Sequence, residues 1–261
     1  MALPRLQLFE LEDQRWFPRT VRDLATDYLH FVQARLAMHR PMVPLLAALL
    51  RRTGAERVVD LCAGGAGPVP ALAAALRAEG VGVPFVLTDL YPNVPAFAAA
   101  ATAGGAGVSW VGEPVDARAV PGHLTGLRTL CNAFHHFAPA DAVAVLRDAA
   151  RCGQPIAVFE YPDLVTPVAV LAVTPWIRPF RWRRLALTYV LPLVPLTCWW
   201  DGLVSTFRAY TPTELEALAD RVGVPGYRWR AGRVAVASPP SRLTYLLGWP
   251  GAVGEPESPS T

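Results

Sequence analysis

The 261-residue sequence contains no lysine, so all 24 of its basic residues are arginine. Without lysine, the chain has no side chain that forms a Schiff base with a carbonyl substrate, which excludes that route of catalysis. The arginines are scattered except for a group at 178–184, and the net charge is only +3. We therefore expect no nucleic-acid partner, because such proteins concentrate basic charge on one surface.

Cysteines are also few. The four are not spaced as C-x-x-C, and no histidine pair lies close to two of them, so the sequence predicts neither a metal site nor a disulfide framework. The two uncharged runs between residues 162 and 208 each fall short of the roughly 20 residues that span a bilayer. The first dozen residues include acids and lack the apolar core of a signal peptide. We expect a reduced, cytoplasmic protein.

Short apolar runs alternate with helical patterns along most of the chain. Two helices are predicted within 19–53, and further helices at 139–152 and 211–221. The predicted strands are 57–61, 83–89, 108–112, 127–134 and 155–161, followed by an antiparallel pair at 227–237 and 241–249. Strands that alternate with helices of this length predict an α/β fold with a doubly wound, mostly parallel sheet.

The pattern divides the chain into a helical cap (1–53), a main domain (54–248) and a disordered tail (249–261). An insertion at 162–208 interrupts the main domain with two uncharged runs, Leu164–Ile177 and Leu185–Trp200, joined by RPFRWRR. Two interpretations remain open. The insertion is either a helical lid over an apolar pocket or an interfacial hairpin that rests on a membrane, where arginine and tryptophan gather at headgroup level.

The most informative segment is RVVDLCAGGAGP at residues 57–68. A buried strand ends at Asp60 and leads into a loop with very small side chains, which lets a cofactor approach backbone N–H groups and the next helix N-terminus. An acid before the glycines favours a ligand with an amino group over a pyrophosphate. Because G-x-G-x-x-G is not in register, an NAD-dependent dehydrogenase is the weakest alternative. The segment indicates S-adenosylmethionine (SAM).

Over roughly residues 55–247 the chain resembles class I SAM-dependent methyltransferases. It also resembles an uncharacterised bacterial subgroup through DQRWFP, DLCAGGAGP, FHHF, FEYP and WDGLVSTFRAYTP. The resemblance implies a Rossmann-like, seven-stranded sheet of order 3-2-1-4-5-7-6 with SAM as cofactor. The first motif of the family matches at Asp60, Cys62, Gly64 and Ala66, although Cys62 and Ala66 stand where glycine is usual.

The resemblance also assigns roles at the cofactor. It implies that Asp60 lies near the amino group and Gly64 beneath the cofactor. Asp89, 22 residues after Gly67, suits the ribose hydroxyls, and Asp116 matches the acid beside the adenine amino group. Further residues expected at the cofactor are Cys62, Gly65, Leu90, Ala117, Asn132 and Trp16. Trp16 either covers the cofactor or packs as a hydrophobic staple for the first helix.

The expected catalytic residues are His135, His136 and Glu160, which follow the fourth and fifth strands. The histidines either take a proton from the substrate or only line the pocket. Glu160 either orients a substrate or pairs with an arginine. The expected substrate-binding residues are Tyr28, Phe134, Tyr161, Asp201 and Arg208. For the last two, a buried ion pair that fixes the lid is the alternative.

The leading hypothesis is SAM-dependent methyl transfer to O, N or C of a small, apolar molecule. Orientation alone can lower such a barrier by about 7–11 kcal/mol. One alternative keeps the SAM site but catalyses a non-methylating reaction such as cyclisation. Another is a SAM-binding module without turnover that associates with a membrane. A small molecule is the expected partner, and peripheral membrane contact is left open.

Overall fold

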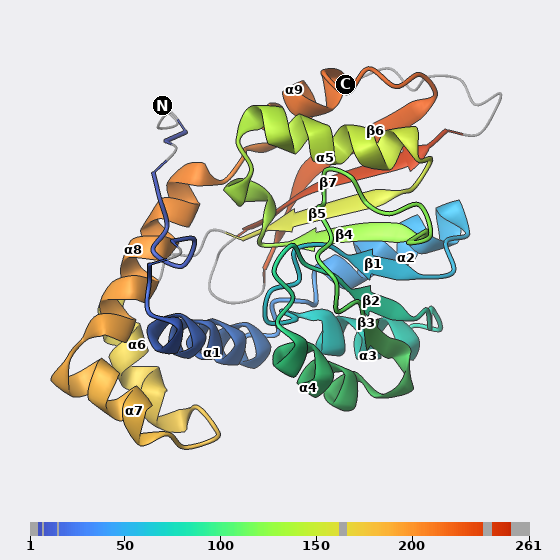
Figure 1. Cartoon of the computed structure of the whole chain (residues 1–261). Coiled ribbons are helices and arrows are strands. Elements are labelled where there is room, and N and C mark those ends of the chain that lie inside the picture. The colour runs from blue at the N-terminus through green and yellow to red at the C-terminus, as the bar shows by residue number, and fades with distance from the viewer. Residues whose placement is uncertain (1–4, 7, 15, 162–165, 237–241, 252–261) are drawn as a thin grey trace.

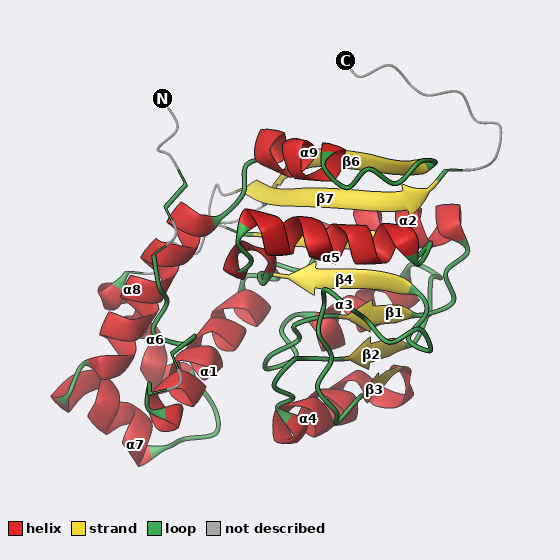
Figure 2. Ribbon diagram, turned by 45° about the horizontal axis from the view of Figure 1, so that its top comes forward, coloured by secondary structure: helices red, strands yellow, loops and turns green. Residues whose placement is uncertain are grey.

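The computed structural model describes residues 5–6, 8–14, 16–161, 166–236 and 242–251. Within them, one seven-stranded sheet has the order β3-β2-β1-β4-β5-β7-β6 (Figures 1 and 2). This confirms the predicted Rossmann-like sheet and its strand order. The strands are β1 (Val58–Asp60), β2 (Phe85–Leu87), β3 (Val108–Trp110), β4 (Leu127–Cys131), β5 (Ile156–Glu160), β6 (Tyr227–Ala235) and β7 (Arg242–Pro250).

The central strands are apolar because both faces of the sheet are covered by helices. Successive residues of β1 face opposite ways. Val58 packs in a core with α2 (Met42–Thr53), α3 (Val69–Ala78) and α4 (Val94–Gly104). Val59 packs in a second core with α5 (Pro139–Arg151) and α9 (Pro212–Asp220). The parallel register places Asp60 beside Leu87 of β2 and Thr129 of β4. The carboxyl ends of the strands therefore share one edge, where ligands of such sheets bind.

The last two strands form the predicted antiparallel pair, and β7 also pairs antiparallel with β5. Helix α9, which precedes them, begins at the predicted cap: Thr211 and Glu214 form a complete capping box. Strand β7 runs through Pro250, so it includes the first two residues of the predicted tail. This correction follows from pairing with β6, in which Trp249 and Pro250 have partners. Residues 252–261 of that tail lie outside the described residues.

The insertion folds as helices that pack on α1 (Arg19–Arg35) and form a lobe beside the sheet (Figure 1). Its helices are α6 (Pro167–Val173), the 3-10 turn η3 (Thr174–Trp176), α7 (Trp182–Leu185), the π-helical η4 (Ala186–Val190) and α8 (Leu193–Arg208). A third apolar core, which includes Leu24, Tyr28, Val170, Val194 and Cys198, joins these helices to α1.

The predicted helical cap is divided between two cores. Helix α1 packs on the lobe, whereas the apolar face of α2 packs in the core of the main domain. Six side chains of α2 are buried there, so this helix belongs with the sheet and not with the lobe. The boundary at residue 53 therefore separates α2 from the strands with which it packs.

Candidate functional site

The loop between β1 and α3 has the backbone of a glycine-rich turn even where the residues are not glycine. Cys62 and Ala66 have φ of 55° and 72°, and Gly64 has 52°. This left-handed region is unfavourable for residues with a Cβ and favours glycine. Cys62 and Ala66, which replace the usual glycines, therefore keep the turn at a cost in strain while their small side chains keep the loop compact.

Asp60 ends β1 beneath this loop. Its side chain is buried, and its Oδ1 accepts a hydrogen bond from the Thr129 hydroxyl at 2.6 Å. Burial raises the pKa of Asp60 to about 7, because the charged form loses its hydration; the hydroxyl of Thr129 opposes the shift and the charge on Asp89 adds to it. The carboxyl group thus changes its charge near neutral pH.

Asp89 connects the loops that follow β1 and β2. Its Oδ2 accepts the Gly64 N–H at 2.8 Å, and its Oδ1 accepts the Tyr91 N–H at the same distance. Its backbone carbonyl also accepts the N–H of Val115, close to Asp116. Each carboxylate oxygen has a second lone pair, so these contacts leave acceptor capacity for hydroxyl groups.

Asp116 forms an ion pair with an arginine, Arg118. Arg118 contacts its Oδ2 at 2.8 Å, and this hydrogen bond lowers the pKa of Asp116. Burial raises the pKa of the Cys62 thiol, and negative charge on Asp89, Asp60 and Asp116 raises it further. Asp60, Asp89 and Asp116 therefore all lie near this loop at the carboxyl edge of the sheet, although the sequence spreads them over 57 residues.

The other residues expected at the cofactor lie in varied surroundings. Gly65 packs against α1, since a Cβ there would collide with the His30 ring. Ala117 is buried and Leu90 is exposed. Trp16 has 69% of its surface exposed and contacts the edge of Phe17. Most of the Trp16 side chain therefore faces solvent in this structure.

Asn132 joins the ends of β4 and β5. Its side-chain Oδ1 accepts the Tyr161 N–H at 2.8 Å, and its φ of 51° is one that asparagine tolerates. Tyr161, a predicted substrate residue, is buried, and its hydroxyl donates to the Met38 carbonyl. These contacts give both residues a role in shaping the sheet edge.

The histidines follow β4 in a 3-10 turn, Phe134–His136. His135 is buried, with its Nδ1 2.6 Å from Glu160 Oε2. The other oxygen of Glu160 accepts the Phe134 N–H at 2.7 Å and the His135 N–H at 3.3 Å. Glu160 therefore fixes both the backbone and the ring of His135, a contact that the sequence analysis did not predict.

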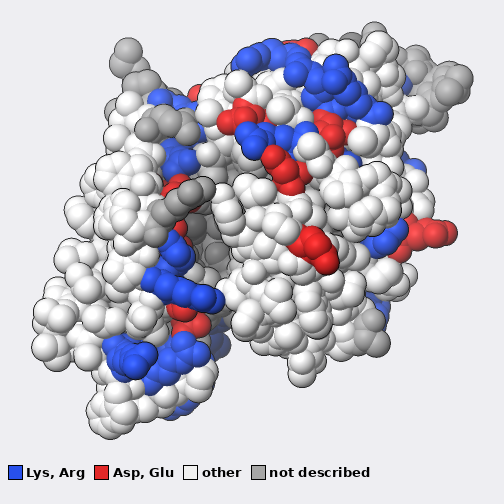
Figure 3. Space-filling model, in the orientation of Figure 1, with Lys and Arg blue, Asp and Glu red and all other residues white. Residues whose placement is uncertain are grey.

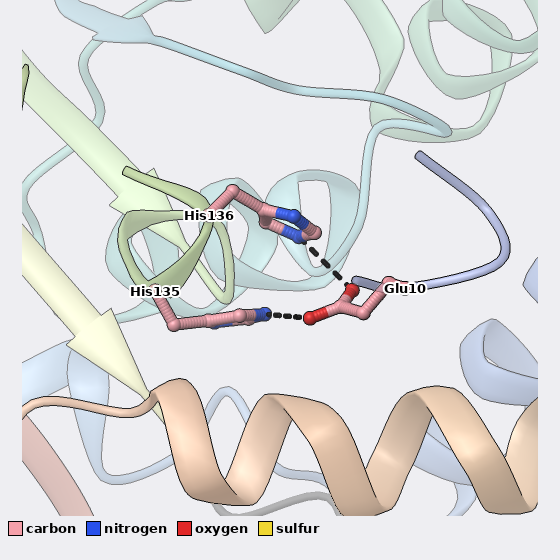
Figure 4. A group of neighbouring side chains, drawn as sticks. All are labelled: Glu10, His135 and His136. Atoms are coloured by element: carbon pink, nitrogen blue, oxygen red, sulfur yellow. Dashed lines mark ion pairs between the residues drawn. The ribbon is translucent and has the colours of Figure 1, made fainter. Parts of the chain in front are cut away.

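A segment from the other end of the chain completes the cluster. Both histidine rings point to Glu10, whose two oxygens lie 3.6 Å from the Nε2 atoms of His135 and His136 (Figure 4). Burial raises the pKa of Glu10 to about 7. Burial also tends to raise the pKa of Asp13. Hydrogen bonds from His136 and Arg208 outweigh this effect, so the pKa of Asp13 is lowered to about 2. Asp13 accordingly stays ionised 3.1 Å from His136 Nδ1.

Helix α8 holds this N-terminal segment in place. Asp201 accepts the backbone N–H groups of Leu11 at 2.6 Å and Glu12 at 3.0 Å. Arg208 contacts Glu10 at 3.3 Å and Asp13 at 3.1 Å, and it donates to the His136 carbonyl at 2.9 Å. In place of the Asp201–Arg208 pair that was considered, each of these two side chains makes two contacts with residues 10–13.

The ligand atoms of Glu10, His135 and His136 lie within 4.8 Å of one another, which one divalent cation could bridge. Arg208 already supplies positive charge to Glu10, however, so we assign no metal to this cluster. That the chain holds no metal stays a prediction.

Two expected substrate residues lie in cores. Phe134 is fully buried against Phe137 and Tyr210, and Tyr28 belongs to the core between α1 and the lobe. Neither offers appreciable surface to a ligand in this structure, because the rings face inward from their elements. The surface itself is hollowed between the lobe and the sheet domain (Figure 3).

Glu10 was missed by the sequence analysis, and Asp13 was noticed there only as part of the DQRWFP segment. The nearest signal is a run of acids at 10, 12 and 13 in an otherwise apolar stretch. Nothing in that run indicates its partners, since Glu10 and His135 are 125 residues apart.

No family model matches the sequence, and no curated protein matches it. Solved structures do share the fold. The plantazolicin methyltransferase BpumL, solved with S-adenosylhomocysteine, has a TM-score of 0.51 at 10% identity, covering 92% of this chain and 94% of its own. The apo methyltransferase SibL has 0.50 at 17% identity, covering 95% and 64%.

An O-methyltransferase family protein from Burkholderia thailandensis has a TM-score of 0.48 at 18% identity and covers 86% of this chain. The chain spans 59% of that protein's length. The likenesses to BpumL and SibL, at 10% and 17% identity, show that the chain shares their fold.

Proposed function

We propose that this protein transfers a methyl group from SAM to an O, N or C atom of a small, apolar molecule. The observation that carries the proposal is the convergence of Asp60, Asp89 and Asp116 around the loop after β1, at the edge of the sheet where its strands end. The BpumL structure, which shares this fold and was solved with S-adenosylhomocysteine, adds support.

The three carboxylates fit the polar groups of SAM. Among the described residues, only Thr129 donates to the side chain of Asp60, and it does so to Oδ1, which leaves Oδ2 for an ammonium group. Asp89 keeps acceptor capacity for a ribose diol. Asp116, already oriented by Arg118, is assigned to the adenine amino group.

SAM supplies a methyl carbon that is activated by its sulfonium, so the protein contributes mainly by holding the acceptor in line. We assign the acceptor end to His135, His136 and Glu160. Of the two histidines His136 is the more exposed, at 35% of its side chain, and ionised Asp13 orients its Nδ1. His136 Nε2 then takes the proton of an acceptor that has one, a contribution of about 10²–10⁴-fold. Glu160 positions His135 and the turn that carries both rings.

The cofactor assignment is tested by titrating SAM calorimetrically into the wild type and Asp89→Asn. Loss of charge-assisted hydrogen bonds, each worth about 1.5–3 kcal/mol, should weaken SAM binding by at least about tenfold. Asp220→Asn, an exposed acid at the end of α9, is the matched control and should bind normally. Equal SAM affinity in wild type and Asp89→Asn would refute the assignment.

The reaction is tested with radiolabelled SAM and a cell extract, followed by mass analysis of the labelled product. A gain of one methylene supports methyl transfer, whereas an altered SAM fragment without a methylated product supports a non-methylating reaction. His136→Gln should lower kcat by about 10²–10⁴-fold and leave SAM affinity unchanged. If its kcat matches the wild type, His136 is not the base.

A further inference from the structure

The tip of the insertion, residues 166–200, combines exposed apolar side chains with charge of one sign. All four of its charged residues are arginine, and it contains no acid. It also holds four of the eight tryptophans of the chain. Arginine beside tryptophan is typical of segments that lie at the headgroup level of a membrane.

One face of this tip is buried and the opposite face is exposed. Val170, Ile177 and Val194 pack against α1. Exposed apolar side chains of the tip include Trp176, Phe180, Trp182, Tyr189, Val190 and Leu191. Trp182 and Trp176 have 77% and 70% of their surface exposed. Solvent-exposed apolar groups gathered in this way mark an interaction surface.

Basic side chains flank these aromatic rings. Arg178, Arg181 and Arg183 are exposed in the same stretch, and Figure 3 shows basic side chains gathered on the lobe. Arg181 and Arg183 also line a pocket of about 360 Å³ together with Thr20 and Trp182. Asp23 also lines this pocket. Asp27 of α1 contacts Arg181 at 3.2 Å and the buried Arg184 at 2.5 Å, so the exposed arginines that Asp27 does not compensate are Arg178 and Arg183.

The positive charge of the tip favours an anionic bilayer over a second copy of the chain as the partner of this surface. A symmetric contact between the tips of two copies would place Arg178 and Arg183 against arginine, because Asp27 of α1 is already paired with Arg181 and Arg184 and the tip itself has no acid. An anionic bilayer instead attracts each arginine and accepts the indole and aliphatic groups below its headgroups.

We propose that the insertion tip docks on the surface of an anionic phospholipid membrane, with Trp176, Phe180 and Trp182 inserted at headgroup level and with the exposed Arg178 and Arg183 on lipid phosphates. Among the described residues no single helix is long and apolar enough to span a bilayer, and the one pair that passes by length and composition, Trp182–Val190 with Leu193–Arg208, is bent by 73°. The short, broken helices suit a position in the interface.

The docking proposal does not depend on methyl transfer. If both hold, the lobe brings the hollow between itself and the sheet close to the bilayer, where an apolar acceptor would be concentrated.

The test is flotation of the full chain with phosphatidylcholine vesicles, with and without phosphatidylglycerol. Wild type should float with the mixed vesicles and only weakly with phosphatidylcholine alone. Arg178→Gln with Arg183→Gln should weaken binding by about 30-fold, from about fivefold per arginine. Trp176→Ser with Trp182→Ser should abolish flotation in high salt, which screens the remaining charges.

The matched controls are Trp110→Ser on β3 and Arg230→Gln on β6, both exposed and outside the lobe. Both should float as the wild type does. The thermal unfolding transition of each tip variant should match the wild type, because the replaced side chains are exposed. Absence of flotation, tip variants that float normally, or a wild-type dimer that the tryptophan variant dissociates would each overturn the proposal. Flotation without SAM binding would leave docking intact and refute the proposed function alone.

Discussion

Replacement of Asp60 by asparagine should remove most of the pH dependence of SAM binding between pH 5 and 7. The carboxyl group is buried, and burial raises its pKa to about 7. It is therefore about 1% ionised at pH 5 and about half ionised at pH 7. If the ammonium group of SAM binds only the ionised form, the apparent Kd should fall by about 50-fold over this interval.

The ligand itself stays cationic in this window, because an α-amino group titrates near about 7.7–8.0. Calorimetric titration of SAM at pH 5, 6 and 7 measures the dependence. Asp60→Asn keeps an acceptor for the Thr129 hydroxyl but has no charge to lose, so its weaker affinity should be nearly constant with pH. Asp220→Asn, the control, should keep the wild-type slope. A wild-type affinity that does not change with pH, or an Asp60→Asn variant with the full slope, would refute the assignment of Asp60.

The same pKa makes a separate prediction about stability. Between about pH 4 and 7 the unfolded carboxyl group has lost its proton while folded Asp60 retains it, so the folded state binds more protons and its stability falls as pH rises. The fall is at most about 1.4 kcal/mol per pH unit per group. Glu10, with its pKa raised to about 7 by burial, acts in the same direction. In urea denaturation, the free energy of unfolding of Asp60→Asn should fall less steeply with rising pH than that of the wild type. An equally steep fall in the variant would contradict the raised pKa.

Three further predictions concern stability and local order. Ala66→Gly should raise the free energy of unfolding by about 1 kcal/mol, because glycine adopts the φ of 72° without strain; a lower value in urea denaturation would contradict this. Asp201→Ala removes two charge-assisted bonds, so hydrogen exchange at the N–H groups of Leu11 and Glu12 should accelerate at least tenfold, and unchanged exchange would argue against the anchor. Thr211→Ala should cost about 1 kcal/mol in thermal or urea unfolding through loss of the capping box.

The sequence predicted the sheet well because its signals are local. Val58, Val59 and Asp60 form a short apolar run that ends in an acid, and the turn residues that follow are adjacent in the chain. The same holds for the strand before Asp89 and for the cap at Thr211. A parallel sheet then brings the ends of such strands to one edge, which is why three acids from separate loops could be expected together.

The contacts around the two histidines were predicted only in part. His135 lies after β4 and Glu160 is the last residue of β5; because these strands are neighbours, the contact agrees with the topology. Phe134 follows the same strand but faces the core, since the direction of a side chain in a short turn depends on local backbone angles. Asp201 and Arg208 were expected to bind substrate or to pair with each other. Both are buried, and the partners that the structure gives them lie in the N-terminal segment.

The strands and the loop that follows Asp60 could be predicted from the sequence alone, because periodicity and turn chemistry act between near neighbours. The order of the strands was expected only from the resemblance to class I SAM-dependent methyltransferases. Only the tertiary structure joined Glu10 to His135 and divided α1 from α2 between two cores. Only the structure also left Trp176 and Trp182 facing solvent. The hydrophobic pattern of an apolar segment is the same whether its second face is buried or exposed to solvent. A contact between two residues 125 positions apart does not change the sequence around either of them. Packing decides both.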